Sequence, residues 1–127
     1  MSVNMLDARA KLAAVLTNGS VPVYTALPDA VSPPCVALGW RIPMIDWATQ
    51  QTRASAFGVL GVTLIGGRLE AEEGIAAIEQ MYDSAQRAMR ADGEGWSVGA
   101  DSGVISEEIG GVSYLLCRLE VRVPLAI

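Results

Sequence analysis

The side chains that most often carry out chemistry in proteins are sparse in this sequence. It contains no histidine, and its only lysine is Lys11. Histidine is the usual proton-transfer group near neutral pH and the commonest ligand of transition metals. The composition therefore excludes Ser-His-Asp catalysis, Cys-His catalysis and the zinc sites that depend on histidine.

The sequence around the two cysteines indicates buried structural residues rather than reactive ones. Cys35 and Cys117 each lie in an apolar, strand-like pattern, and they form no CxxC pair of the kind that redox and metal sites use. A cysteine in such a pattern behaves as a small buried apolar residue. We therefore predict two reduced thiols in the core rather than a disulfide.

Paired acids are the remaining candidates for acid–base chemistry. Glu72-Glu73 and Glu107-Glu108 are neighbours in the sequence, but adjacent side chains diverge by about 100° on a helix and point to opposite faces of a strand. Ser102, Ser106 and Ser113 have no histidine to activate them. We expect both acidic pairs to be solvated surface groups, and we predict no catalytic, metal or cofactor residue and no enzymatic activity.

A glycine-rich segment at residues 58–67 invites comparison with phosphate-binding loops. It lacks the Gly-Lys-Ser/Thr ending with which such loops hold phosphate. Gly66-Gly67 precedes a helical pattern, so these residues either bind an anion at a helix N-terminus or simply connect a strand to a helix. The second interpretation is the simpler one, and it predicts that the strand ends at these two glycines.

One segment has the composition of an interaction surface. Residues 40–55 combine two arginines and one aspartate with large apolar side chains, whereas the whole chain has a net charge of −5. Tryptophan, methionine and arginine are enriched in interface cores, and tryptophan and arginine often anchor them. The predicted subunit or tube interface comprises Trp40, Arg41, Met44, Ile45, Trp47 and Arg53. In the alternative interpretation, one or both tryptophans fold back onto the protein's own core.

The elements that must position this segment follow from hydrophobic spacing. Apolar residues recur at helical spacing from Asn4 to Thr17, and residues 21–24 and 35–38 have strand patterns. Between those strands, prolines hold an extended, ordered loop. Residues 41–54 have no clean period and contain a proline, which predicts an irregular loop, and residues 57–65 alternate as a strand.

The second half of the chain begins with the longest predicted element. A helix is expected from about Leu69 to Ala91, about 35 Å long, with a buried apolar stripe formed by Ala71, Ile75, Ile78, Tyr82, Ala85 and Met89. The small residues of this stripe suit packing on a sheet better than a coiled coil. Residues 96–100 form a short strand, and residues 104–109 and 112–124 pair around Gly110-Gly111.

These elements predict a single α+β domain over residues 1–127. Its sheet is mostly antiparallel with about four to six strands, one long helix packs on one face, and a short helix lies at the N-terminus. No apolar run approaches the length of a membrane span, so we expect no membrane association. The net charge of −5 disfavours binding to a phosphate backbone, which depends on clustered lysine and arginine.

The order of the elements and several residue patterns resemble the tail-terminator, or tail-completion, proteins of long-tailed bacteriophages. The resemblance covers almost the whole chain and consists of residue classes rather than an invariant motif. It is carried by Asn4-Met-Leu-Asp-Ala-Arg-Ala-Lys-Leu12, Val21-Pro-Val-Tyr24, Pro33-Pro-Cys-Val-Ala-Leu-Gly39 and Tyr114-Leu-Leu-Cys-Arg-Leu-Glu-Val-Arg-Val123.

The resemblance implies a structural virion protein without catalytic activity. Such proteins form a ring, usually a hexamer, at the head-proximal end of the tail tube and stop its polymerisation. The implied partners are copies of the chain itself, the tail tube protein and the head–tail connector or stopper protein, while DNA passes through the lumen without specific binding. The implied location is the neck region of the virion tail, after assembly in the host cytoplasm.

A negatively charged lumen would repel DNA and let it slide, and we hypothesise that Glu72, Glu73, Glu107 and Glu108 line it. Two other functions stay open. One is another neck protein, such as a head-completion or stopper protein, which would bind filled heads rather than halt tube growth. The other is a small cytosolic α+β ligand-binding domain or enzyme, which would require an enclosed pocket with converging polar groups.

Overall fold

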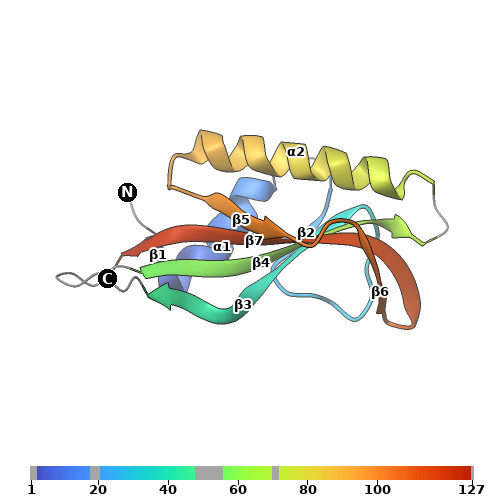
Figure 1. Cartoon of the computed structure of the whole chain (residues 1–127), viewed down its shortest axis with the longest axis horizontal. Helices are drawn as coiled ribbons and strands as arrows, with labels where there is room; N and C mark the ends of the chain where they lie inside the picture. The colour runs from blue at the N-terminus through green and yellow to red at the C-terminus, as the bar shows by residue number, and fades with distance from the viewer. Residues whose placement is uncertain (1–2, 18–20, 48–55, 70–71, 127) are drawn as a thin grey trace.

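The computed structural model describes residues 3–17, 21–47, 56–69 and 72–126. Within these ranges, two helices and seven strands follow one another (Figure 1). Their bounds are β1 (Val3–Asn4), α1 (Met5–Leu16), β2 (Val23–Tyr24), β3 (Cys35–Trp47), β4 (Ala56–Arg68), α2 (Gly74–Asp92), β5 (Ser97–Asp101), β6 (Ile105–Ile109) and β7 (Val112–Ala126).

All the strands belong to one sheet, and β7 is central to it. One edge of β7 pairs with β4 from Phe57↔Pro124 to Arg68↔Tyr114, while its other edge pairs in turn with β6, β5 and β1. Beyond β4, the order continues with β3 and β2. Only the two-residue strands β1 and β2 pair in parallel. The sheet is therefore mostly antiparallel, and the predicted α+β fold class is confirmed.

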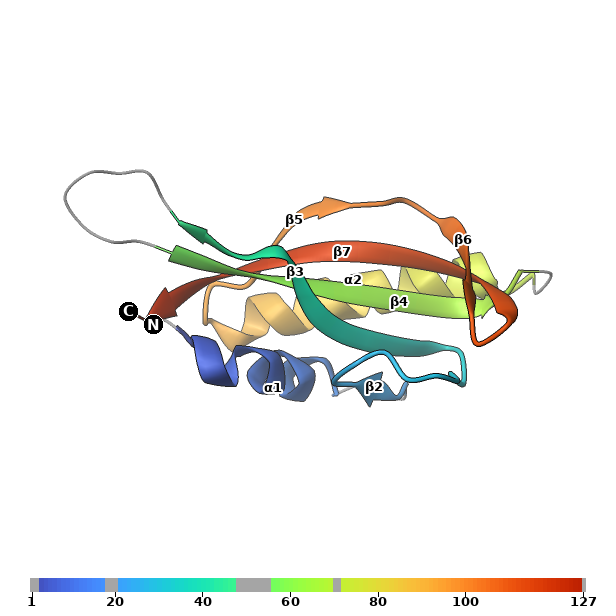
Figure 2. The ribbon, with the colours of Figure 1, turned by 90° about the horizontal axis from the view of Figure 1, so that it is seen from below.

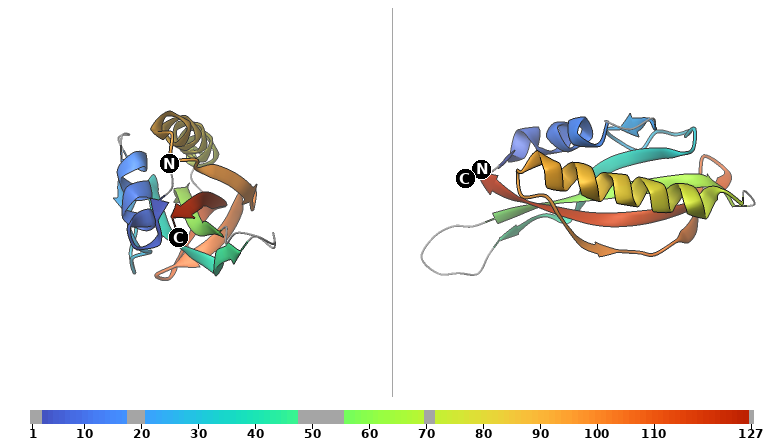
Figure 3. Two further views of the ribbon diagram at one scale, coloured as in Figure 1. Left: turned by 90° about the vertical axis from the view of Figure 1, so that its left-hand side faces the viewer. Right: turned by 90° about the horizontal axis from the view of Figure 1, so that it is seen from above.

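Both helices pack against the same face of this sheet, as Figures 1 and 3 show. Strand alternation directs Leu60, Val62 and Leu64 of β4 toward the helices, together with alternate residues of β7 from Cys117 to Leu125. The helices contribute Ala8, Leu12, Leu16, Ile78, Met81, Ala85 and Met89. Burying these apolar side chains between helix and sheet forms the main core, and burial of this kind is the dominant stabilising term in folding.

The long helix begins later than its sequence pattern indicates. It starts at Gly74 rather than near Leu69, and Ile75, predicted to be buried, is 49% exposed. The reason is that β4 does not end at Gly66-Gly67 but continues to Arg68, with a register shift between Ile65 and Gly67. The chain must then turn before the helix can start. Ala71, also expected in the buried stripe, lies outside the described residues.

Close approach of helix and sheet explains why the residue in this register shift is glycine. A Cβ atom on Gly66 would lie 2.1 Å from the carbonyl oxygen of Gly74 and 2.7 Å from Cγ1 of Ile78. Neither distance is compatible with van der Waals radii, so the first turn of α2 rests directly on the backbone of β4. This contact sets the position of the helix on the sheet.

The irregular loop predicted from Arg41 to Ala54 is wrong as far as Trp47. Strand β3 runs through this segment and pairs with β4 at Ile45↔Gly58 and Trp47↔Ala56. The register shifts between Trp40 and Ile45, and Pro43 lies within the shift. A bulge of this kind changes which residues share a face, so the apolar pattern loses its period although the backbone remains a strand. The remainder of the predicted loop, residues 48–55, is outside the described residues.

The predicted proline loop covers part of the second sheet face. Val31 from this loop and Tyr24 from β2 pack on a smaller apolar cluster made by Cys35, Ile65, Ile109, Tyr114 and Leu116. Cys35 and Cys117 are both buried and free, as predicted. Burial raises the pKa of Cys35 to about 11. Within the described part of the chain, no helix is long and apolar enough to cross a membrane.

Candidate functional site

The residues predicted to form an interface do not share one surface. Strand alternation separates neighbours on β3: Trp40 and Ile45 are half-buried against the main core, whereas Arg41 is exposed on the opposite face. Met44 is 41% exposed. Trp40 therefore folds back onto the protein's own core, which was the alternative interpretation of the tryptophans.

The structure does not show on which face the side chains of two predicted interface residues, Trp47 and Arg53, lie. Trp47 ends β3, where its backbone pairs with Ala56. Arg53 lies outside the described residues. Arg41 and Met44 are thus the predicted interface residues whose side chains the structure places at the surface.

Figure 2 views the sheet from the side away from α2, with β3 beside β4. The sheet face opposite the helices, which we call the open face, has a trough. Its floor consists of small residues at paired positions of β3 and β4: Gly39 lies opposite Gly61, and Ala37 lies opposite Thr63. The volume of the trough is about 200 Å³. A Cβ atom on Gly39 would meet nothing within 4 Å. The floor is therefore close to the level of the backbone.

Larger side chains flank this trough. Leu27, from the loop before β3, lines it and is 51% exposed. Arg41 and Arg118 also line it, and the side chain of Arg41 lies over Gly61, with its Cδ atom 3.5 Å from where a Cβ of that glycine would be. Arg118 forms an ion pair with Glu107 on β6. Among the described residues, no carboxylate forms an ion pair with Arg41.

Farther along the open face, charges and an aromatic ring are already paired within the chain. The guanidinium of Arg122 lies 5.2 Å from the centroid of the Phe57 ring, an arrangement that is favourable for a cation and an aromatic face. A guanidinium nitrogen of the same arginine is 3.9 Å from a carboxylate oxygen of Glu120. This part of the face is therefore more nearly neutral than the area around Arg41.

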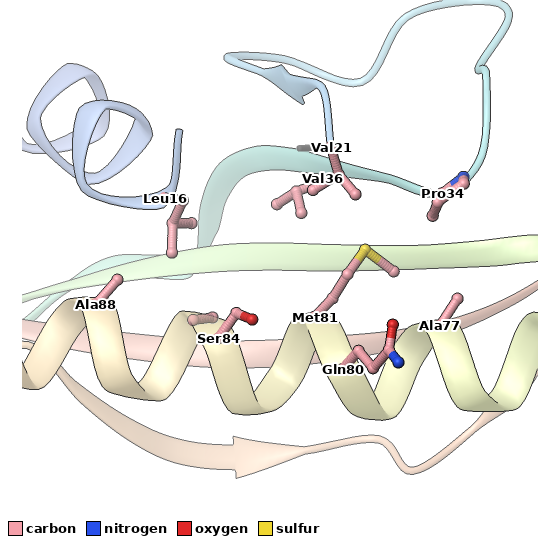
Figure 4. A pocket seen from close by; sticks show the side chains of 10 residues that line it. Leu16, Val21, Pro34, Val36, Ala77, Gln80, Met81, Ser84 and Ala88 are labelled. Carbon is pink, nitrogen blue, oxygen red and sulfur yellow. The ribbon is translucent and has the colours of Figure 1, made fainter. Parts of the chain in front are cut away.

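A second hollow lies on the other side of the sheet, between α2 and the segments around the end of α1 and the start of β3 (Figure 4). Leu16, Val21, Pro34 and Val36 face α2 across an open groove of about 270 Å³. Among the described residues that line it, only Gln80 and Ser84 carry polar side chains. Ligand pockets are usually larger and place several polar groups around the ligand. The groove can accept an apolar group but offers little to orient it.

Two further polar contacts join α2 to the segment that follows it. The hydroxyl of Tyr82 donates to a carboxylate oxygen of Asp101 at 2.9 Å, and the indole Nε1 of Trp96 donates to a carboxylate oxygen of Asp92 at 2.8 Å. Desolvation, followed by the bond to Asp101, raises the pKa of Tyr82 to about 12. Both hydrogen bonds hold α2 against the segment that follows it. Because the Tyr82 hydroxyl and the Trp96 indole each have a carboxylate partner, we assign them a structural role.

The acidic pairs lie where solvent reaches them. Glu72, Glu73 and Glu108 are exposed, and Glu107 is half-buried beside Arg118. The start of α2 and strand β6, which carry or adjoin these acids, lie at the same end of the molecule (Figures 1 and 3). No three histidine, cysteine, aspartate or glutamate side chains within the described ranges are arranged to hold a metal ion.

Sequence reasoning missed the trough. The only signal for it was the presence of small residues at alternate positions in two segments, Ala37 with Gly39 and Gly61 with Thr63. That signal acquires meaning only when β3 and β4 are known to pair in the register that places these residues side by side.

Two comparisons with known proteins found no relative, since no protein-family model and no curated protein matches this sequence. Proposals for function therefore depend on the resemblance described above and on the geometry.

Proposed function

We propose that this chain is a structural virion protein that assembles into a ring at the head-proximal end of a phage tail tube. In this role it ends tube polymerisation and joins the tail to the head connector. The observation that carries the proposal is the asymmetry of the sheet: two helices pack on one face, while the other has a trough bordered by Leu27 and Arg41. This asymmetry gives one subunit two different surfaces for its neighbours.

A closed ring requires contacts between unlike surfaces, so each subunit needs two of them. The open face is one candidate, and the outward side of α2, which lies across the sheet from it, is another (Figure 3). Exposed apolar side chains occur on both: Leu27 borders the trough, and Ile75 lies on α2. Either side chain would leave water in such a contact, and the charges around it would select the partner surface.

The acidic end of the molecule supports the passage of DNA as part of the same proposal. Glu72, Glu73 and Glu108 add negative charge there without a described basic partner, in a chain whose net charge is −5. If this end faces the lumen, it repels the phosphate backbone rather than binding it. The negative charge then allows DNA to move through the ring.

The proposal is tested with the purified full chain and a tail tube protein that polymerises. Light scattering during gel filtration measures the mass of the assembly, and electron microscopy measures tube length with and without the protein. We expect a ring-sized oligomer, either alone or on tube ends, and shorter tubes. A protein that stays monomeric with tubes present and leaves tube length unchanged would refute the proposal. Binding to filled heads without an effect on tubes would indicate a head-completion or stopper protein instead.

The apolar groove beside α2 suits a second candidate, a small domain that binds an apolar ligand without polar groups to orient it. Its walls are mainly aliphatic, and Ala88 lines it from α2 (Figure 4). The test is saturable binding of a fluorescent apolar probe, with Ala88→Trp to fill the groove. One-to-one binding that this substitution removes would support the second candidate. Weak binding unaffected by the substitution would leave the ring proposal as the better one.

A further inference from the structure

We propose that the trough on the open face is the docking site for helix α2 of a second copy of this chain. The inference depends on the proposed ring and specifies which surfaces of neighbouring subunits meet. It commits to one contact, in which Arg41 of one copy faces Glu79 of the next. Because the two residues lie on opposite sides of the same sheet, one copy cannot make this contact with itself.

The trough has the form that a helix needs. Another backbone approaches a sheet closely where its residues are small, and here Ala37, Gly39 and Thr63 form the uncovered floor, while the side chain of Arg41 lies over Gly61. Gly39 has open space above it, since an added Cβ would meet nothing within 4 Å. Leu27 borders the floor with an exposed apolar side chain, and Arg41 provides a positive charge that no described carboxylate pairs with.

The outward side of α2 offers the complementary features. Ile75, Glu79 and Asp83 are all exposed, and their four-residue spacing places them along one line of the helix. Ile78 and Met81 are buried against the sheet, so Ile75, three residues before Ile78, lies at the border between the buried and outward sides of α2. Asp83 is already paired with Arg87 at 3.0 Å, whereas Glu79 forms no ion pair with any residue in the described ranges.

Charge and apolarity match in the docked arrangement. Ile75 of one copy can cover Leu27 of the other, while Glu79 lies opposite Arg41. Each apolar side chain then leaves water, and each of the two charges gains a partner of opposite sign. The trough and the helix are different surfaces of one subunit, so repeated contacts join subunits head-to-tail. Such a chain of subunits closes into a ring when the rotation between neighbouring subunits adds up to a full turn.

The first experiment reverses one charge at a time in the full chain. Arg41→Glu places two acids opposite each other, and Glu79→Arg places two bases opposite each other. We expect each substitution to weaken self-association at least about tenfold in analytical ultracentrifugation. The double variant Arg41→Glu/Glu79→Arg should regain it, and so should an equal mixture of the two single variants, because alternating subunits then present opposite charges at every contact.

Two matched controls reverse exposed charges on surfaces that the proposal does not use. Arg9→Glu and Asp7→Arg both change exposed side chains of α1. Both should associate like the unaltered protein. Association unchanged in Arg41→Glu and Glu79→Arg, or lost in both without recovery in the double variant, would overturn the docking arrangement.

A second experiment uses shape rather than charge. Gly39→Val adds a side chain in a strand position where the isolated subunit has room for it, so thermal unfolding of the monomer should change little. The added methyl groups occupy the trough, and association should fall by at least about tenfold. An unchanged affinity in Gly39→Val would overturn the inference even if the charge variants behaved as expected.

These results separate the inference from the proposed function. If the unaltered chain forms rings and shortens tubes but the variants do so equally well, the ring remains and the docking surfaces are wrong. If the unaltered chain neither self-associates nor acts on tube ends, the proposed function itself fails.

Discussion

The contact between Gly66 and the first turn of α2 makes a strong prediction about stability. In Gly66→Ala the new Cβ would lie 2.1 Å from the carbonyl oxygen of Gly74, whereas Cβ contacts under 3.0 Å essentially never occur in proteins. The obstacle is backbone, so it cannot rotate away as a flexible side chain would. The start of the helix must move outward by about 1 Å, the difference between these two distances. A gap of that size removes a quarter to a half of the dispersion energy of each contact beneath the helix.

We therefore expect Gly66→Ala to lower the free energy of unfolding by about 3 kcal/mol, at the upper end of the usual range for overpacking. For a chain of 127 residues this corresponds to a melting temperature about 10 °C lower. Urea unfolding followed by circular dichroism measures the change. The matched control is Gly39→Ala in the neighbouring strand β3, where an added Cβ meets nothing within 4 Å. Equal stability of the two variants would refute the close contact between α2 and β4.

Three further predictions concern single side chains. Trp96→Phe removes the bond from Nε1 to Asp92 and should cost about 1 kcal/mol in urea unfolding, and an unchanged midpoint would contradict a structural role for that bond. Trp40→Ala should cost about 2 kcal/mol, because the ring is half-buried against the main core, and no loss would place it away from the core. Burial raises the pKa of Cys35 from 9.0 to about 11, so its contribution to stability is complete below pH 9 and is lost between pH 9 and 11, where the unfolded thiol ionises first. Between pH 9 and 11, the free energy of unfolding should therefore decrease less with rising pH for Cys35→Ala than for the unaltered protein.

Local patterns were sufficient where packing follows a regular period. The helical spacing correctly placed Ile78, Ala85 and Met89 in the core, and Gly110-Gly111 correctly marked the turn between β6 and β7. The burial of Cys35 and Cys117 also followed from their apolar surroundings. In each case the residues that decide the structure are close together in the sequence, so a short window contains the necessary information.

Features that depend on pairing between distant segments could not be found in this way. The shift between Trp40 and Ile45 hides the alternation of β3, because residues on either side of it follow different faces. The sequence pattern predicts that the strand ends at Gly66, although the constraint on this residue is the carbonyl group of Gly74 across a turn. The trough around Gly39 likewise requires the register of β3 against β4.

The position of β7 in the sheet also controls when a newly made chain can fold. Four strands, β1, β4, β5 and β6, pair with residues 112–126, and Val3 pairs with Leu125. Before those residues leave the ribosome, only the helices and the pairing of β2, β3 and β4 can form, and the other edge of β4, beside Leu60, Val62 and Leu64, has no strand to complete the core. Nascent chains should therefore expose apolar surface until synthesis passes β7, and folding chaperones should bind them during that interval.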